Sequence, residues 1–322
     1  MRIFDTKNLT FSESKVGISK DEIKDKFIIA KKHDLEQLQT MFNFDYSTII
    51  DSEIIDETVR YSNYKEYDFI SLIFANEDPE TKIINLQELN LYLSQNYLLL
   101  IFPDSPTPEL LETLAMIEKR INTLFDQNNP HKSWLNRILF VILDSLISSE
   151  SSFLEQLEDQ TESLLQVITT VKKTNDQLFS QIRNLRGKIY ATMKQVRALE
   201  SIMNAIALDE GGYILKEEEY LFKNIANRAT SLAKLAQSIY SLTEELLHSY
   251  DSKIGEQTNT IVTRLTSVTI LMSIWTVIGG VYGMNFDNMP ELHWKYGYFA
   301  VLAILISVTL ILSIFLHKRK LL

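Results

Sequence analysis

A row of small, hydroxylated and amide side chains near the end of the chain is the sequence feature with the clearest chemical potential. Its members follow one another at intervals of three or four residues: Asn259, Val262, Thr266, Thr269, Ser273, Thr276, Gly280 and Gly283. That spacing predicts that they share one face of an α-helix. Hydroxyl and backbone oxygens in such a row can line a water-filled path. The asparagines at its ends, Asn259 and Asn285, add amide oxygens that attract a hydrated cation without a fixed charge.

The same row has a second interpretation. Small and hydroxylated residues let membrane helices pack closely, so the row is also typical of a helix-helix contact. The opposite face suits lipid or a neighbouring helix, because it carries Leu271, Met272, Ile274, Trp275, Ile278 and Tyr282. A conducting path needs several copies of the chain, since two spans cannot enclose a pore. The two asparagines favour the path over the contact.

Two uncharged stretches predict membrane-spanning helices over residues 265–286 and 296–316. They contain roughly 22 and 21 residues, enough to cross a hydrocarbon core as helices. The first span forms the pore, residues 287–295 an external loop, and residues 317–322 a basic cytoplasmic tail. Basic residues lie before the first span and after the second, and such flanks usually stay on the cytoplasmic side of the membrane. We therefore expect both termini to be cytoplasmic and the two spans to lie in the plasma membrane. In the loop, Asp287 and Glu291 attract cations toward the pore mouth.

The absence of acids and histidines from both spans limits the chemistry of the path. Neither a proton relay nor a tight inner-sphere transition-metal site is expected there. Mg²⁺ gives up its water reluctantly, so the amide of Asn285 is expected to bind the hydrated ion through outer-sphere contacts.

Composition excludes several classes of protein. A net charge of -10 argues against a nucleic-acid partner, and the lack of cysteine excludes thiolate metal sites. The first residues lack the apolar segment of a secretory signal, so we expect the large front portion to be cytoplasmic. No phosphate-binding loop, dinucleotide-binding turn or nucleophile-base pair is evident, so an enzyme is not expected.

The front of the chain is predicted to be a cytoplasmic α/β domain over residues 1–130, with strands near 26–30, 68–74, 83–93 and 97–102. Imperfect alternation in residues 83–93 predicts a bulge or turn near Glu88. Asp34 is the expected N-cap of a helix over residues 34–42, with Gln37 at its capping-box position.

A helical hairpin over residues 131–212 and a stalk helix over residues 213–264 are expected to follow, and the stalk continues into the first span. Its apolar seam comprises Ile225, Leu232, Leu235, Ile239, Leu242 and Leu246. A rod of this length needs neighbours along it, and one chain alone is not expected to bury the seam.

The residues Tyr282-Gly283-Met284-Asn285-Phe286, followed by Met289-Pro290-Glu291-Leu292 and a terminal Lys-Arg-Lys-Leu-Leu, resemble the signature of the CorA magnesium transporter family. The resemblance implies an α-helical membrane protein with a cytoplasmic α/β domain, assembled as a homopentameric funnel in the bilayer. It further implies that Gly283, Met284 and Asn285 form an outer selectivity ring. Asn259 matches an inner pore asparagine, and Val262 with Leu265 falls where a hydrophobic constriction forms, although Val262 is smaller than the expected methionine.

The stalk departs from the family pattern. The resemblance implies that aspartates of the stalk bind regulatory divalent ions between subunits. Mg²⁺ is then both the expected transported ion and a candidate regulatory ion. Here residues 223–228 place Asn224 and Asn227 where acids are expected, and amides beside basic residues are poor ligands for a hard cation. Either a metal sensor uses other acids, or gating depends less on a metal sensor. The candidate acids are Asp144, Glu150, Glu155, Asp159 and Glu217 to Glu219.

These observations together predict a divalent cation channel, with Mg²⁺ uptake as the first hypothesis and Co²⁺ and Ni²⁺ as further cargo. A ZntB-like zinc transporter of the same superfamily is the nearest alternative. A membrane-anchored coiled-coil scaffold without transport is an alternative from a different class.

Overall fold

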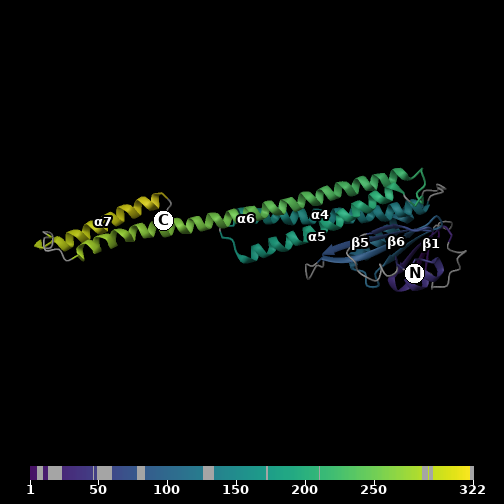
Figure 1. The fold of residues 1–322 in the computed structure, drawn as a ribbon, viewed down its shortest axis with the longest axis horizontal. Coiled ribbons are helices and arrows are strands. Elements are labelled where there is room, and N and C mark those ends of the chain that lie inside the picture. The colour runs from purple at the N-terminus through teal and green to yellow at the C-terminus, as the bar shows by residue number, and fades with distance from the viewer. Residues whose placement is uncertain are drawn as a thin grey trace. The chain divides into compact units, whose positions relative to one another are not determined.

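The computed structural model describes residues 1–5, 10–13, 24–45, 47–48, 60–77, 84–125, 134–171, 173–209, 211–284, 289 and 293–319. The chain divides into two units, which are described separately below. Unit 1 comprises Met1–Leu164 and Ser180–Leu246, and unit 2 comprises Leu165–Phe179 and Leu247–Leu322. The elements confirm the predicted order: an α/β domain, then a long helix that leads into two apolar helices at the carboxyl end (Figure 1).

Unit 1 contains a seven-stranded sheet with the order β2-β1-β3-β7-β6-β5-β4. Its neighbouring strands are antiparallel except for β3 and β7, which run parallel. The strands are β1 (Arg2–Asp5), β2 (Thr10–Glu13), β3 (Lys26–Lys31), β4 (Arg60–Asn63), β5 (Asp68–Glu77), β6 (Ile84–Leu93) and β7 (Tyr97–Phe102). Strands therefore form in all four of the segments in which the sequence predicted them.

The bulge expected near Glu88 is wrong. Strand β6 pairs with β5 in one unbroken register from Asp68↔Leu93 to Glu77↔Ile84, with Glu88 directly opposite Ile73. The alternation is irregular because both faces of this sheet are covered, so apolar residues occur on both. Leu91 belongs to the core on one face and Tyr92 to the core on the other.

Helix α1 (Leu35–Phe42) begins after Asp34, as predicted, but the predicted capping box with Gln37 is absent. A short 3₁₀ turn (Lys32–Asp34) precedes the helix, and the Asp34 carboxylate instead accepts a hydrogen bond from the backbone N–H of Lys31 at 3.2 Å. That side chain points back along the chain, and so it caps the turn and not the helix.

Helices follow the sheet, as predicted. They are α3 (Pro108–Phe125), α4 (Trp134–Thr170), α5 (Asp176–Leu208), α6 (Glu219–Tyr282) and α7 (Gly297–Lys318). The break after α5 occurs at Asp209, which has a positive φ of 49° and whose carboxylate accepts hydrogen bonds from the N–H groups of Tyr213 and Ile214. Gly212 completes the turn at a φ of 68°, a conformation that glycine adopts without strain.

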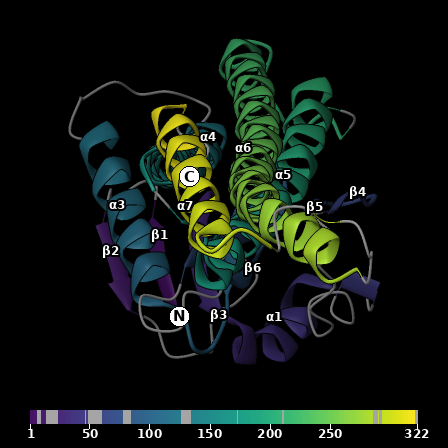
Figure 2. The same cartoon turned by 90° about the vertical axis from the view of Figure 1, so that its left-hand side faces the viewer.

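Two apolar clusters cover the two faces of the sheet in unit 1. The smaller one packs α1 against alternate residues of β3, β6 and β7, such as Ile28, Tyr92 and Leu99. The larger one joins the other face to α3, α4, α5 and the first part of α6. Figure 2 shows α1 and the helices α3, α4 and α5 on opposite sides of the strands.

The expectation that a single chain leaves the stalk seam uncovered is wrong for four of its six residues, whereas Leu235 and Leu242 stay partly exposed. Ile225, Leu232 and Ile239 lie within the large core cluster, and Leu246 is also buried. Helices α4 and α5 contain 37 and 33 residues, long enough to accompany α6 through unit 1. Neighbours from the same chain therefore support this part of the long rod.

Side chains from α4 and α5 hold the part of β5 that lies beyond its pairing with β4, which ends at Ser71. The Glu150 carboxyl accepts a hydrogen bond from the backbone N–H of Ala75 at 3.4 Å, and Gln195 Nε2 donates to the carbonyl of Ile73 at 2.9 Å. Gln195 Nε2 also donates to Glu150 at 3.2 Å. Burial raises the pKa of the Glu150 carboxyl to about 8, so this acid is neutral in the folded protein at lower pH.

Replacing Ile239 by alanine tests the buried seam. The substitution should lower the free energy of unfolding by about 2 to 5 kcal/mol, because it leaves a cavity against α4 and α5. Urea denaturation of the full chain in detergent, followed by circular dichroism, measures the change. Ser238→Ala, at the exposed neighbouring position, is the control and should be nearly neutral. Equal effects of the two substitutions would contradict the described packing.

Glu150→Gln tests the raised pKa. An unfolded glutamate loses its proton near pH 4.5, whereas Glu150 in the folded chain keeps it until about pH 8. The contribution of this residue to stability is therefore complete below pH 4.5 and is lost as the pH rises through about 8. Relative to wild type, the variant should become progressively more stable over that range in urea denaturation. The exposed Glu155→Gln on the same helix should show no such trend.

Candidate pore-lining face and its surroundings

The row of residues predicted to line a path lies on one face of α6 in unit 2, and we call this face the polar stripe. Its members are Asn259, Val262, Thr266, Thr269, Ser273, Thr276, Gly280 and Gly283, and all of them are exposed. The stretch contains no proline and is helical throughout, although most of its apolar residues are β-branched and have modest helix propensity. The chain itself thus leaves the whole stripe free.

Helix α7 packs on a different face of α6. Residues of α6 with reduced exposure are Thr263, Ser267, Leu271, Ile274 and Ile278, again at intervals of three or four. Trp275 Nε1 donates a hydrogen bond to Thr309 Oγ1 of α7 at 3.0 Å, which fixes the two helices side by side (Figure 1). If the polar stripe served as a close helix-helix contact, α7 of the same chain would not be the helix that it contacts.

The hydroxyl protons of the stripe are committed to the helix backbone. Thr266 donates to the carbonyl of Val262 at 2.9 Å, Thr269 to that of Leu265 at 2.9 Å, and Thr276 to that of Met272 at 3.1 Å. Ser273 donates to the carbonyl of Ile270 at 2.8 Å. Each exposed hydroxyl oxygen therefore keeps only acceptor lone pairs for solvent. Such oxygens suit water molecules that point their hydrogens outward, as the hydration shell of a cation does.

The inner end of the stripe is positioned by the turn between α4 and α5. Tyr250 donates to the carbonyl of Asn175 at 3.3 Å, and Thr174 donates to Gln257 Oε1 at 3.2 Å. Tyr250 lies nine residues and Gln257 two residues before Asn259 along α6. Just beyond it, Val262 and Leu265 are 53% and 66% exposed, so both apolar side chains project from the helix where a constriction was predicted.

At the outer end, α6 stops at Tyr282 and the next two residues continue its last turn. The N–H of Gly283 donates to the carbonyl of Gly279 at 3.0 Å. A Cβ atom at Gly283 would lie 3.1 Å from that carbonyl oxygen, so a larger residue would disturb the turn. Met284 is exposed. The predicted selectivity residue Asn285 lies outside the described residues, as do the loop acids Asp287 and Glu291.

The acids suggested as an alternative sensor do not gather into one site. Asp144 pairs with Arg120 and Arg228, Glu218 with Arg137, and Glu150 is enclosed in the core. Glu155, Asp159 and Glu217 are exposed. Among the described residues, no group of three or more histidine, aspartate or glutamate side chains could hold a metal ion.

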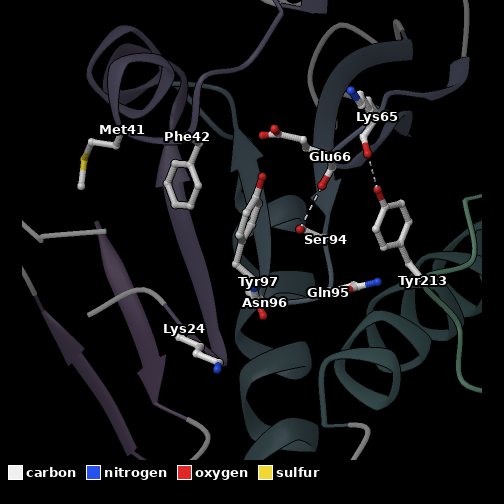
Figure 3. A pocket seen from close by; sticks show the side chains of 10 residues that line it. All are labelled: Lys24, Met41, Phe42, Lys65, Glu66, Ser94, Gln95, Asn96, Tyr97 and Tyr213. Carbon is white, nitrogen blue, oxygen red and sulfur yellow. Dashed lines mark hydrogen bonds between the residues drawn. The ribbon is translucent and has the colours of Figure 1, made fainter. Parts of the chain in front are cut away.

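Unit 1 also contains a cavity of about 590 Å³ at the turns of the sheet (Figure 3). Figure 3 shows Tyr213 donating to the carbonyl of Lys65, at 3.5 Å, and Ser94 donating to that of Glu66, at 3.0 Å. Burial raises the pKa of the Tyr97 and Tyr213 hydroxyls, which keeps both neutral. The hydroxyls of Tyr213 and Ser94 therefore already form hydrogen bonds within the protein. The described residues that line this cavity include no nucleophile-base pair typical of an active site.

Two of the described helices are long and apolar enough to cross a membrane: α6, through its carboxyl-terminal part, and α7. Only 6% and 11% of their most apolar stretches are buried, which distinguishes them from core helices of a water-soluble protein.

Known proteins share this arrangement. The chain is 23% identical over 257 residues to the cobalt/magnesium transport protein CorA of Thermotoga maritima, covering 80% of this chain and 71% of that protein. The complete structure of the CorA magnesium transporter from Methanocaldococcus jannaschii superposes with a TM-score of 0.80 at 18% identity, covering 98% of this chain and 97% of that one. The cytoplasmic domain of ZntB from Vibrio parahaemolyticus gives a TM-score of 0.62 at 10% identity, covering 80% and 98%.

The model of one protein family matches residues 26–319, and so includes strands β3 to β7 of the sheet, the long helix α6 and the apolar helix α7. The chain therefore belongs to the CorA-like Mg²⁺ transporter protein family, and it is a divalent metal ion transporter and not an enzyme.

Proposed function

We propose that the chain assembles as a homopentamer in the plasma membrane and admits hydrated Mg²⁺ to the cytoplasm through a central pore, with Co²⁺ and Ni²⁺ as further cargo. The supporting observation is the polar stripe, which α7 leaves uncovered and which presents hydroxyl oxygens as acceptors. A single stripe cannot enclose water, so symmetric copies must complete the wall. In this arrangement both termini are cytoplasmic and the loop over residues 287–295 faces outward.

The outer end of the stripe supplies selectivity in this proposal. Gly283, Met284 and Asn285 form a ring in which the asparagine amide binds the water shell of the ion. Neutral amide oxygens are weak enough to release a divalent ion, whereas several carboxylates would bind it tightly. Asp287 and Glu291 lie just beyond the ring in sequence and raise the local cation concentration. The ion flows down its electrochemical gradient, and no hydrolysis is needed.

The zinc alternative rests on one observation, the likeness of unit 1 and its helices to the cytoplasmic domain of ZntB. The two cargoes make different demands on the pore. Zn²⁺ prefers nitrogen and sulfur ligands, and neither span contains histidine or cysteine. We therefore place Mg²⁺ first. Flux of Mg²⁺, Co²⁺, Ni²⁺ and Zn²⁺ into proteoliposomes, with and without a proton gradient, distinguishes the two.

Asn285→Ala should abolish transport while the oligomer stays intact, because the change removes the amide that binds the hydrated ion. The measurement is Mg²⁺ uptake by proteoliposomes that contain an entrapped fluorescent indicator, with the oligomeric state checked by light scattering. Asn288→Ala, the same substitution three residues farther along, is the matched control and should keep most of the flux. Normal uptake by an intact Asn285→Ala oligomer would refute the proposed ring.

Removing apolar bulk at the inner end should increase conduction. We expect Val262→Ala or Leu265→Ala to raise the Mg²⁺ flux at high internal Mg²⁺, because a wider constriction holds water more readily. Val268→Ala is the control for Val262→Ala, since it makes the same change at an exposed position of α6 outside the polar stripe. Unchanged flux in both the Val262 and the Leu265 variant, or a rise in the control equal to that of Val262→Ala, would argue against a constriction at Val262 and Leu265.

A further inference from the structure

A cluster of charged side chains joins α3, α4 and α6 in unit 1. Asp144 of α4 is at its centre, with a side chain that is only 12% exposed. Arg120 of α3 donates to Asp144 Oδ2 at 2.5 Å, and Arg228 of α6 pairs with the other carboxylate oxygen. One carboxylate thus bridges guanidinium groups from two different helices.

Hydroxyl groups of α4 complete the cluster. Arg120 Nη1 donates to Ser145 Oγ at 2.7 Å, and Arg228 Nη2 donates to Ser148 Oγ at 3.2 Å. Ser148 in turn donates to the backbone carbonyl of Asp144 at 2.8 Å. Each guanidinium therefore contacts both the carboxylate and a serine, and the three charged groups sum to a formal charge of one positive unit.

The chemistry of this junction does not suit a divalent cation. Such an ion needs several anionic or carbonyl oxygens, but both oxygens of Asp144 already contact arginine. On the exposed side of α6, Asn224 and Asn227 present neutral amides. Lys223 adds a second positive charge, and it pairs with Glu219 at 3.1 Å. The regulatory metal site that the family resemblance implies at residues 223–228 therefore does not fit these residues.

We propose that the Arg228 guanidinium acts as a built-in cation that ties α6 to α4, so that this junction holds together without a divalent ion and does not respond to divalent ion concentration. Its consequence for the regulation of transport rests on the proposed function. It places a fixed positive charge, Arg228, in the segment where the family resemblance implies a bound metal ion. Any inhibition of transport by internal Mg²⁺ must then arise elsewhere in the molecule.

Amide hydrogen exchange of the full chain in detergent micelles tests this proposal at the junction itself. In wild type, peptides covering residues 138–148 and 224–235 should exchange at the same rate in EDTA and in millimolar Mg²⁺. Arg228→Gln should speed their exchange by about three- to fivefold, because α6 loses an ion pair and a hydrogen bond to α4. Arg228→Gln should have a smaller effect in an Asp144→Asn background than in wild type, because Asp144→Asn already removes the ion pair and leaves only the hydrogen bond from Arg228 to Ser148 to be lost.

Two further variants make the result decisive. Lys234→Gln removes a positive charge from an exposed position of the same helix and should change nothing. Arg228→Lys keeps the charge and should stay close to wild type, which guards against a glutamine variant that fails to fold. Protection of these peptides by Mg²⁺ in wild type, or unchanged exchange in Arg228→Gln, would overturn the proposal. No flux is measured, so a failure of the transport hypothesis would leave this result unaffected.

Discussion

The structure depends on the periodicity of one unbroken helix, α6. Because an α-helix returns to the same face every three to four residues, the side chains that face the core in unit 1 determine which ones remain free. Ile225, Leu232, Ile239 and Leu246 recur every seven residues and are buried. A second set with the same period is exposed throughout: Asn224, Asn227, Ser231, Lys234, Ser238, Ser241, Glu245, His248 and Ser252.

The exposed set continues into unit 2. Continued in steps of seven, the exposed set leads to Asn259, Thr266, Ser273 and Gly280 of the polar stripe. The buried set is interrupted at Thr260, which is exposed, before it reaches Ser267 and Ile274, which have reduced exposure. Within unit 2, the residues beside α7 and the residues of the polar stripe lie on different faces of α6. The stripe is therefore left uncovered by α7.

Local patterns in the sequence predicted the parts of this arrangement that depend on neighbouring residues. The two spans follow from uncharged length, and the stripe follows from spacing. What failed depends on contacts between distant segments. The apolar pattern of β6 is irregular because both faces of the sheet are covered, although its pairing with β5 is unbroken. The stalk seam is buried because α4 and α5 reach it. No local pattern links Arg228 to Asp144, which lies on another helix. The amide chemistry of Asn285 follows from the sequence, but its place in a selectivity ring was implied only by the family resemblance.

The lack of charge along the stripe is a condition for conduction in the proposed pore. A ring of carboxylates inside a membrane would bind a divalent ion strongly, and ions held strongly leave slowly. Hydroxyl oxygens whose protons are committed to Val262, Leu265 and Met272 carbonyls attract the hydration shell by dipoles alone. The attraction is then spread over many weak acceptors, so that an ion can move from one turn of the helix to the next without losing its water. Charge that concentrates cations is useful only outside this region, where Asp287 and Glu291 occur in the sequence.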